Sequence, residues 1–125
     1  MKVTIQPYNK MRYETCGDYI MENGHWHFYI AKLEKRRYEW LVLIHEIIEC
    51  YLCSLLMIKE KDIYEFDLMF EQERKNFLHT EDEEPGDDRQ APYYYQHQIA
   101  TFFEKIFAFI LFVNWREYDE AVVDL

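Results

Sequence analysis

Residues 19–30 have the sequence YIMENGHWHFYI, which predicts a β-hairpin. Asn23-Gly24 at its centre is the strongest short hairpin signal, because both central residues of a type I′ turn adopt positive φ. A two-residue turn places Glu22 opposite His25 and so fixes the register of the two strands. Side chains alternate along a strand, so one face of the hairpin is apolar and we expect it to meet the core. That face carries Tyr19, Met21, Trp26, Phe28 and Ile30.

The two strands of this hairpin extend over residues 13–22 and 25–33, and weak alternation at residues 1–8 predicts a third strand. The rest of the chain has helical periodicity, except for a charged segment at residues 79–92 that contains Pro85-Gly86 and predicts a loop. The order predicts an α+β fold with a small N-terminal antiparallel sheet of about three strands, followed by three to four helices.

The predicted helices occupy Arg36–Ile58, Asp62–Phe77, Pro92–Val113 and a short segment that begins after Asn114. Asp62 and Glu65 have the spacing of a capping box at the start of the second helix. Pro92 suits the first turn of the third helix, because the missing N–H costs nothing there. Asn114 and Glu117 have the same capping spacing before the last helix.

Length and composition indicate one domain over residues 1–125 with a sizeable core. Half of the 125 residues are apolar and 18% are aromatic, which excludes a disordered chain. The formal charge is −10, from 14 basic and 24 acidic residues. Binding to duplex nucleic acid or to an anionic membrane surface needs clustered Lys and Arg, so neither partner is expected.

Cysteine usage and the apolar stretches indicate a cytoplasmic protein. Three cysteines do not form an even disulfide framework, and residues 1–7 alternate where a signal peptide would be apolar. Cys50 and Cys53 lie inside a predicted helix without a second cysteine pair, so we interpret them as apolar core residues. The apolar stretch at residues 40–58 has ionisable groups at its centre, which argues against a transmembrane helix.

The sharpest chemical feature is His45-Glu46-Ile47-Ile48-Glu49. Positions four apart lie on one face of a helix, so His45 and Glu49 can reach one metal ion together. Glu46 is turned by about 100° from His45, on the flank of that face. The spacing follows the logic of the H-E-x-x-H helix, in which the intervening Glu is the general base. A carboxylate is an accepted zinc ligand, so Glu49 can stand where that motif has its second His.

A third ligand must come from elsewhere in the chain, and His97 is our first choice. It lies one turn into an apolar helix, where a histidine needs a polar partner. Glu104 is seven residues further, about 10.5 Å along the axis, so we expect it outside the metal ligands as a supporting group. Two imidazoles and one carboxylate with an open fourth position form the ligand set of a catalytic zinc site.

Other polar residues are weaker candidates for a functional site. Asp67 borders an apolar helix face and is the weaker metal candidate, with a solvated or ion-paired Asp as its alternative. His25 and His27 share the hairpin face opposite Trp26, so we interpret both as surface residues, with Glu22 as a cross-strand partner of His25. The alternative for the central motif is that His45 is a hydrogen-bonded core histidine and that Glu46 and Glu49 lie at a solvated edge.

Two resemblances follow from these motifs. The order of three strands and a helix that carries His45-Glu46-x-x-Glu49 resembles a minimal zincin-like metallopeptidase, and it implies His45 as a ligand and Glu46 as the base. Zincins have His where this chain has Glu49. The chain also resembles short bacterial and phage proteins of unknown function. The similar segments are YETCGDY at 13–19, HEIIE at 45–49, FD at 66–67, EPGD at 84–87 and APY through His97. That resemblance implies that Asp67 belongs with the histidines and Glu49.

The sequence therefore predicts a metal-dependent hydrolase of the zincin-like type, with zinc held by His45, Glu49 and His97. Iron or manganese also suits two histidines and one carboxylate. A peptide or amide bond is the expected substrate, by analogy with zincins. Two alternatives remain open: an acidic interaction protein that acts as an inhibitor or nucleic-acid mimic, and a purely structural metal site.

Overall fold

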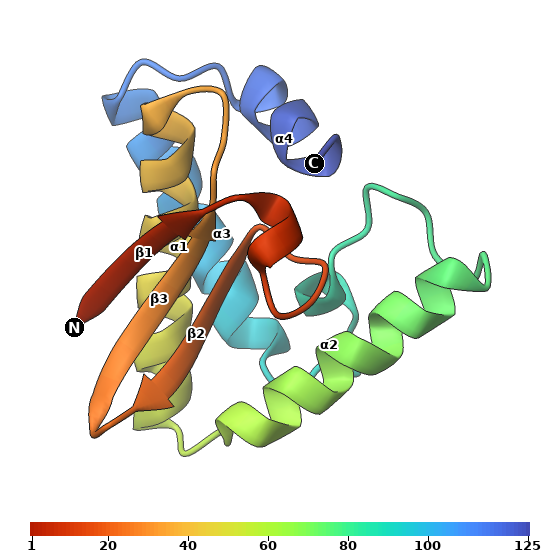
Figure 1. Ribbon diagram of the computed structural model, residues 1–125. Coiled ribbons are helices and arrows are strands. Elements are labelled where there is room, and N and C mark those ends of the chain that lie inside the picture. The colour runs from red at the N-terminus through yellow and green to blue at the C-terminus, as the bar shows by residue number, and fades with distance from the viewer.

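The computed structural model describes all 125 residues and has an α+β architecture, in which a three-stranded sheet is followed by four helices (Figure 1). The strands are β1 (Lys2–Gln6), β2 (Gly17–Glu22) and β3 (His25–Ala31). The helices are α1 (Arg36–Leu55), α2 (Glu60–Lys75), α3 (Tyr94–Ile110) and α4 (Trp115–Val123). Short 3₁₀ turns occupy Tyr8–Lys10 and Pro85–Asp87.

The hairpin between β2 and β3 has the predicted register. Glu22 pairs with His25, and the two turn residues Asn23 and Gly24 have φ of 51° and 79°. The face that carries Tyr19, Phe28 and Ile30 is buried in the core. Close to the turn, Met21 is exposed and Trp26 is only partly buried, although the Met21 backbone N–H donates to Glu60 at the start of α2.

The prediction of an antiparallel sheet is wrong for its first strand. The strand order is β1-β3-β2, and β1 pairs with β3 in parallel, from Lys2 opposite His27 to Gln6 opposite Ala31. After β1 the chain turns back through the 3₁₀ turn at Tyr8–Lys10, so β1 covers the free edge of β3 (Figure 1). Residue alternation shows that a segment is a strand, but it does not indicate which edge the strand joins.

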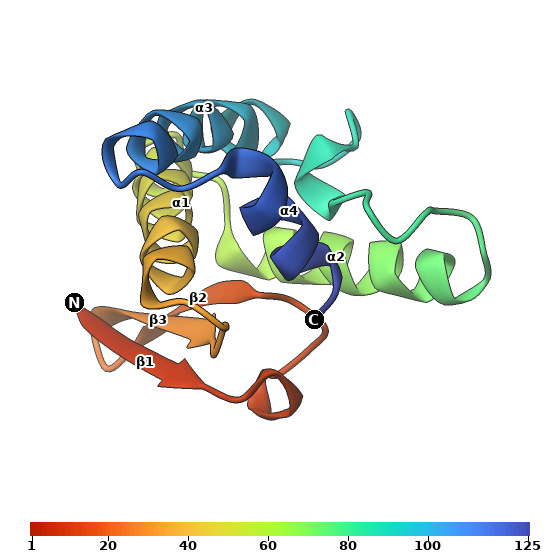
Figure 2. The same ribbon diagram turned by 90° about the horizontal axis from the view of Figure 1, so that it is seen from above.

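The helices form two layers over one face of the sheet, with α1 against β2 and β3 and α3 against α1 (Figure 2). Because α1 lies between the sheet and α3, it contributes to both clusters of buried apolar side chains. One cluster centres on Tyr19, Phe28 and Cys50, and the other on Ile30 and Leu41. The polar residues at the middle of α1 are therefore held between α3 and the strands.

Helix ends follow the sequence signals in part. The capping box at Asp62 and Glu65 is wrong, since α2 begins two residues earlier and its N-cap, Lys59, makes no side-chain capping bond. The second capping prediction is confirmed, because the Asn114 side chain accepts a hydrogen bond from the backbone N–H of Glu117. No helix is both long enough and apolar enough to traverse a bilayer.

Candidate metal centre

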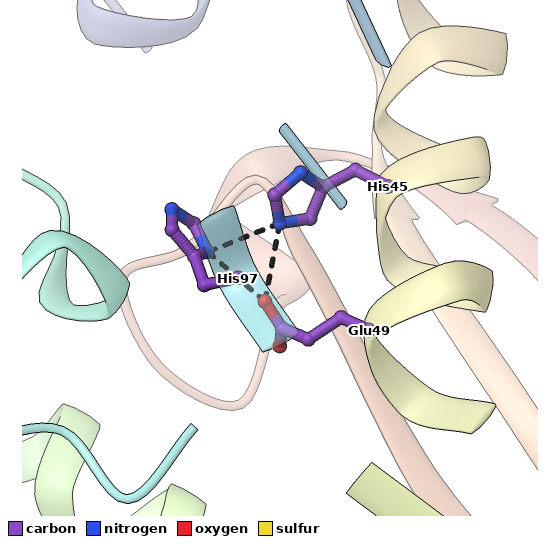
Figure 3. Close-up of side chains that lie close together, drawn as sticks. All are labelled: His45, Glu49 and His97. Atoms are coloured by element: carbon purple, nitrogen blue, oxygen red, sulfur yellow. Dashed lines mark hydrogen bonds and ion pairs between the residues drawn. The ribbon is translucent and has the colours of Figure 1, made fainter. Parts of the chain in front are cut away.

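Three side chains from two helices converge on one point. His45 and Glu49 project from the middle of α1, one turn apart, and His97 projects toward them from the first turn of α3 (Figure 3). Nε2 of His45 lies 3.1 Å from Nδ1 of His97, and both nitrogens approach the same oxygen of Glu49, at 3.1 and 3.0 Å. All three side chains are at least nine-tenths buried.

The triangle formed by these donor atoms is close to the face of a metal tetrahedron. Ligand atoms about 2.0–2.1 Å from a tetrahedral zinc ion lie about 3.3–3.4 Å from one another. The observed sides of 3.0–3.1 Å need to open by only a few tenths of an ångström. The donor atoms of His45, Glu49 and His97 are therefore close enough together to hold one ion.

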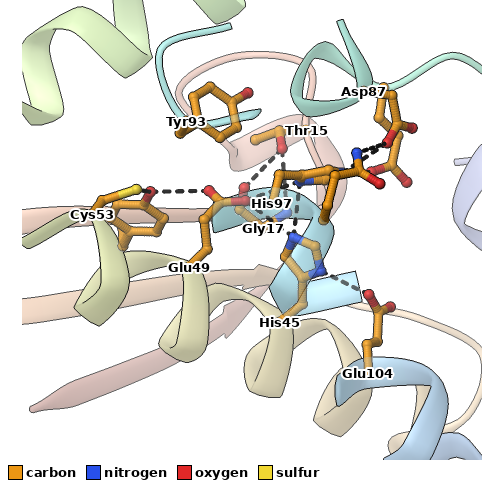
Figure 4. Close-up of polar contacts among 12 residues, drawn as sticks. Thr15, Gly17, His45, Glu49, Cys53, Asp87, Tyr93, His97 and Glu104 are labelled. Carbon is orange, nitrogen blue, oxygen red and sulfur yellow. Dashed lines mark hydrogen bonds and ion pairs between the residues drawn. The ribbon is translucent and has the colours of Figure 1, made fainter. Parts of the chain in front are cut away.

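The outer nitrogen of His45 is fixed by a carboxylate. Its Nδ1 lies 2.8 Å from Oε1 of Glu104, which reaches across from α3 (Figure 4). The other oxygen of Glu104 accepts a hydrogen bond from the Tyr118 hydroxyl of α4. A carboxylate that accepts the Nδ1 proton leaves the lone pair on Nε2, the nitrogen that faces Glu49.

The outer nitrogen of His97 is held in the same manner by the turn at Pro85–Asp87. Its Nε2 lies 3.1 Å from Oε2 of Glu84 and 3.4 Å from Oδ1 of Asp87. Gly86 packs directly on the imidazole ring, since a Cβ atom there would lie 2.3 Å from Cγ of His97. The lone pair of His97 is thus on Nδ1, which faces the same point as His45.

Glu49 is oriented by the sheet. Its second oxygen, Oε1, accepts a hydrogen bond of 3.0 Å from the Tyr19 hydroxyl on β2. Tyr19 is itself buried in the core. One oxygen of Glu49 is thereby anchored to the sheet, while the other is directed at the two histidines.

Burial and the neighbouring charges shift the pKa values of these three side chains in opposite directions. Burial alone would lower the pKa of His45, but its hydrogen bonds to Glu104 and Glu49 raise the pKa well above the usual value. The pKa of His97 is raised in the same way, against burial, by Asp87, Glu49 and Glu84. Burial would raise the pKa of Glu49, and the two histidines instead lower it to about 2. The site therefore favours a carboxylate paired with positive charge.

Glu46, the predicted base, lies beside the triangle and takes part in none of its hydrogen bonds. Its side chain packs against Gly17 of β2, where a Cβ atom would lie 2.7 Å from Cγ of Glu46. Burial, followed by the nearby charge of Glu49, raises the pKa of Glu46 well above its usual value. Glu46 lines the same cavity as His45, Glu49 and His97.

That cavity has a volume of about 720 Å³ and lies between α1, α3, α4 and the loop at residues 81–87. Twelve of its lining residues are Asp or Glu, and only Arg74 and Lys105 are Lys or Arg. His45, Glu49 and His97 lie in the wall of this cavity. A cavity of this size is sufficient for a small molecule or a short peptide segment.

The remaining sequence candidates lie elsewhere. Asp67 is buried on α2, where it accepts hydrogen bonds from Tyr13, at 2.7 Å, and from Tyr93. His25 is exposed, as expected. The surface prediction for His27 is wrong, because β1 covers it: its ring is buried and contacts Thr4 on β1 and Glu22 on β2. Although Glu22 pairs with His25 in the register of the strands, its side chain hydrogen-bonds to His27.

Sequence reasoning did not find all the residues that hold the site. Glu104 was expected as a supporting group, and the structure pairs it with His45. Nothing in the sequence points to Tyr118, which lies on α4. The only signals for Glu84 and Asp87 are the EPGD segment and the charged loop before His97, and loop acids are commonly solvated.

No family model matches the chain, and no curated protein or solved structure is significantly similar to it.

Proposed function

We propose that this protein is a metal-dependent hydrolase of the zincin-like type, in which His45, Glu49 and His97 hold the metal ion and Glu46 is the general base. The observation that carries the proposal is the convergence of two imidazole nitrogens and one carboxylate oxygen within 3.0–3.1 Å. The outer nitrogen of each histidine faces a carboxylate of its own. Metal-binding histidines in proteins commonly have such an outer partner.

The arrangement of protons supports a cation at the centre. When the outer nitrogens donate to Glu104 and to Glu84 or Asp87, the inner nitrogens present only lone pairs. Three electron-rich atoms then face one another in a buried space, which is unfavourable without a positive charge between them. A divalent ion supplies that charge and is coordinated by all three atoms.

The mechanism assigns separate roles to the residues of the cavity. A zinc ion held by His45, Glu49 and His97 would lower the pKa of a bound water to about 7 and would polarise a carbonyl group. Glu46 would accept a proton from the attacking water while the water oxygen forms a bond to the carbonyl carbon. Glu46 then returns the proton to the leaving nitrogen as the carbon–nitrogen bond breaks. Glu104 and Tyr19 keep the ligands in place throughout.

The lining of the cavity favours a substrate with positive charge. Its carboxylates far outnumber Arg74 and Lys105, so an anionic substrate would be repelled at the entrance. We propose an amide or peptide bond close to a basic group, by analogy with zincins. Zinc is the proposed ion, and iron or manganese would suit the same ligands. All three cysteines are free, which supports a reducing, cytoplasmic location.

Elemental analysis of protein purified without a metal-binding tag tests the ligand assignment. We expect about one metal ion per chain in the wild type, loss of the ion in His45→Ala and Glu49→Ala, and retention in Glu46→Gln. His25→Ala is the matched control, since His25 is an exposed histidine outside the cavity. Full occupancy in both alanine variants would overturn the assignment.

Activity against short basic peptides then separates a catalytic from a structural metal. Loss of hydrolysis in metal-loaded Glu46→Gln supports the catalytic function, and retained hydrolysis overturns the role of Glu46. A structural site would need a fourth protein ligand, but Asp67 and Glu104 are engaged with tyrosines and with His45. Absence of metal from every variant would favour the acidic interaction protein, whose exposed acids at residues 81–83 would then bind a basic partner.

A further inference from the structure

Helix α3 has two faces of different character. The residues that point to α1 and the metal centre are buried: Gln96, His97, Ala100, Glu104 and Ala108. The opposite face is exposed and apolar, and no other element of the chain covers it (Figure 2). Exposed large apolar side chains on one face of a helix indicate a surface that another protein covers.

The exposed residues follow a regular spacing. Tyr95, Ile99, Phe102, Ile106 and Phe109 are separated by four, three, four and three positions, and they form what we term the α3 seam. Their exposed fractions range from 39% at Ile106 to 83% at Phe109. This is the spacing of the a and d positions in helices that pair along their length. The spacing therefore points to another helix as the occupant.

The α3 seam has the same pattern in both directions. From either end it alternates aromatic, isoleucine, aromatic, isoleucine, aromatic, with Phe102 at the centre. Two antiparallel copies related by a two-fold axis at Phe102 would place Tyr95 opposite Phe109 of the second copy. A closed two-fold dimer needs such a self-complementary surface.

Area and charge agree with this partner. With Phe103 and Ile110, which flank it, the α3 seam exposes roughly 700 Å² at roughly 180 Å² for each fully exposed side chain. Each partner of a standard interface contributes about 800 Å². The face carries no carboxylate, so two chains of charge −10 can meet there. Lys105 is the only Lys or Arg of α3, whereas helices that lie on membranes are rich in Lys and Arg.

We propose that the chain forms a two-fold homodimer through antiparallel contact of the α3 seams. The metal centres lie on the opposite side of each α3, so both cavities stay open in the dimer. Light scattering and sedimentation equilibrium test the proposal. The wild type is expected at twice the chain mass of 15.6 kDa. Phe102→Glu should weaken dimerisation on the order of a hundredfold.

The control is Met69→Glu, which places the same charge on an exposed apolar position of α2 and should leave the dimer intact. Because Phe102 is 61% exposed, Phe102→Glu should keep the helical circular dichroism of the wild type. A monomeric wild type at about 100 µM, or a Phe102→Glu dimer of unchanged affinity, would overturn the proposal.

Cysteine crosslinking tests the arrangement of the helices. Under mild oxidation, Phe102→Cys should form a covalent dimer, because position 102 faces its own copy at the axis. Tyr95→Cys should not, because position 95 faces position 109 of the second copy. The wild type, whose Cys50 and Cys53 are buried and whose Cys16 is partly exposed, is the background control. A covalent dimer of Tyr95→Cys without one of Phe102→Cys would overturn the antiparallel arrangement.

Discussion

His45 Nε2 and His97 Nδ1 lie 3.1 Å apart, although 52 positions separate the two residues in the chain. A distance this short between two ring nitrogens requires a proton or a metal ion that both can share. Glu49 contributes an oxygen to the same point, at 3.0–3.1 Å from each ring. Packing of α3 on α1 is what brings these atoms together, so the stability of that packing and metal affinity should be linked.

Glu104→Gln should weaken metal binding by about 10–100-fold, because the amide holds the Nδ1 proton of His45 less strongly than a carboxylate does. Competition with a chromogenic chelator measures the affinity. Glu65→Gln on the exposed side of α2 is the control and should bind metal like the wild type. Equal affinities of the two variants would contradict the role of Glu104.

Tyr19→Phe should lower the free energy of unfolding by about 1.5–3 kcal/mol, because it removes a hydrogen bond to the buried carboxylate of Glu49. Urea denaturation of metal-free protein gives this value. Tyr51→Phe, at an exposed position of α1, should change stability by less than about 0.5 kcal/mol. A Tyr19→Phe variant as stable as Tyr51→Phe would show that Tyr19 does not hold the carboxylate.

Gly86→Ala should reduce metal affinity by about tenfold or more. The added Cβ would lie 2.3 Å from Cγ of His97, so the turn must move and release Glu84 and Asp87 from the ring. Isothermal titration with zinc measures the change. Gly24→Ala is the matched control, since its Cβ meets nothing within 4 Å and any strain stays in the hairpin turn. Similar affinities of both variants would argue against a role of the turn.

Asp67 should make stability depend on pH. Burial, opposed by hydrogen bonds from Tyr93 and Tyr13, raises its pKa from 3.8 to about 7. The folded chain therefore binds the Asp67 proton more tightly than the unfolded chain does. Stability should be highest below pH 4 for this group and should fall by as much as about 4 kcal/mol as pH rises to about 7.

Urea denaturation of metal-free protein across this pH range isolates the contribution of Asp67. The decrease should be smaller in Asp67→Asn, which cannot ionise, than in the wild type. Asp62→Asn at an exposed position of α2 should keep the wild-type decrease. The same pH profile in all three proteins would contradict the raised pKa.

Signals carried by residues close together in the sequence predicted the hairpin and the four helices. Asn23-Gly24 set the hairpin register, and helical periodicity located α1 to α4 to within a few residues at each end. The parallel pairing of β1 with β3 could not be predicted, because its partner is chosen by tertiary packing. His27 was misassigned for the same reason, since only the position of β1 buries that face of β3.

The candidate site shows the same division. Helical spacing brought His45 and Glu49 together, and a polar residue in an apolar helix indicated His97. The carboxylates that contact the outer nitrogens of the histidines are positioned by the packing of α4 and of the turn at Pro85–Asp87. Hydrophobic periodicity in the sequence does not predict this packing. Asp67, a weaker candidate by sequence, lies between two tyrosines because α2 packs against the segment before β2.

The parallel β1–β3 pair has a consequence for the order of folding. The β2–β3 hairpin closes through a two-residue turn and can form within microseconds, whereas Lys2 must find His27, 25 positions away, after β3 exists. We expect β1 to dock last, so in pulsed hydrogen exchange its amides should gain protection after those of β3. His27 would then be the last of the buried histidines to lose its contact with solvent, because its ring becomes buried only when β1 completes the sheet.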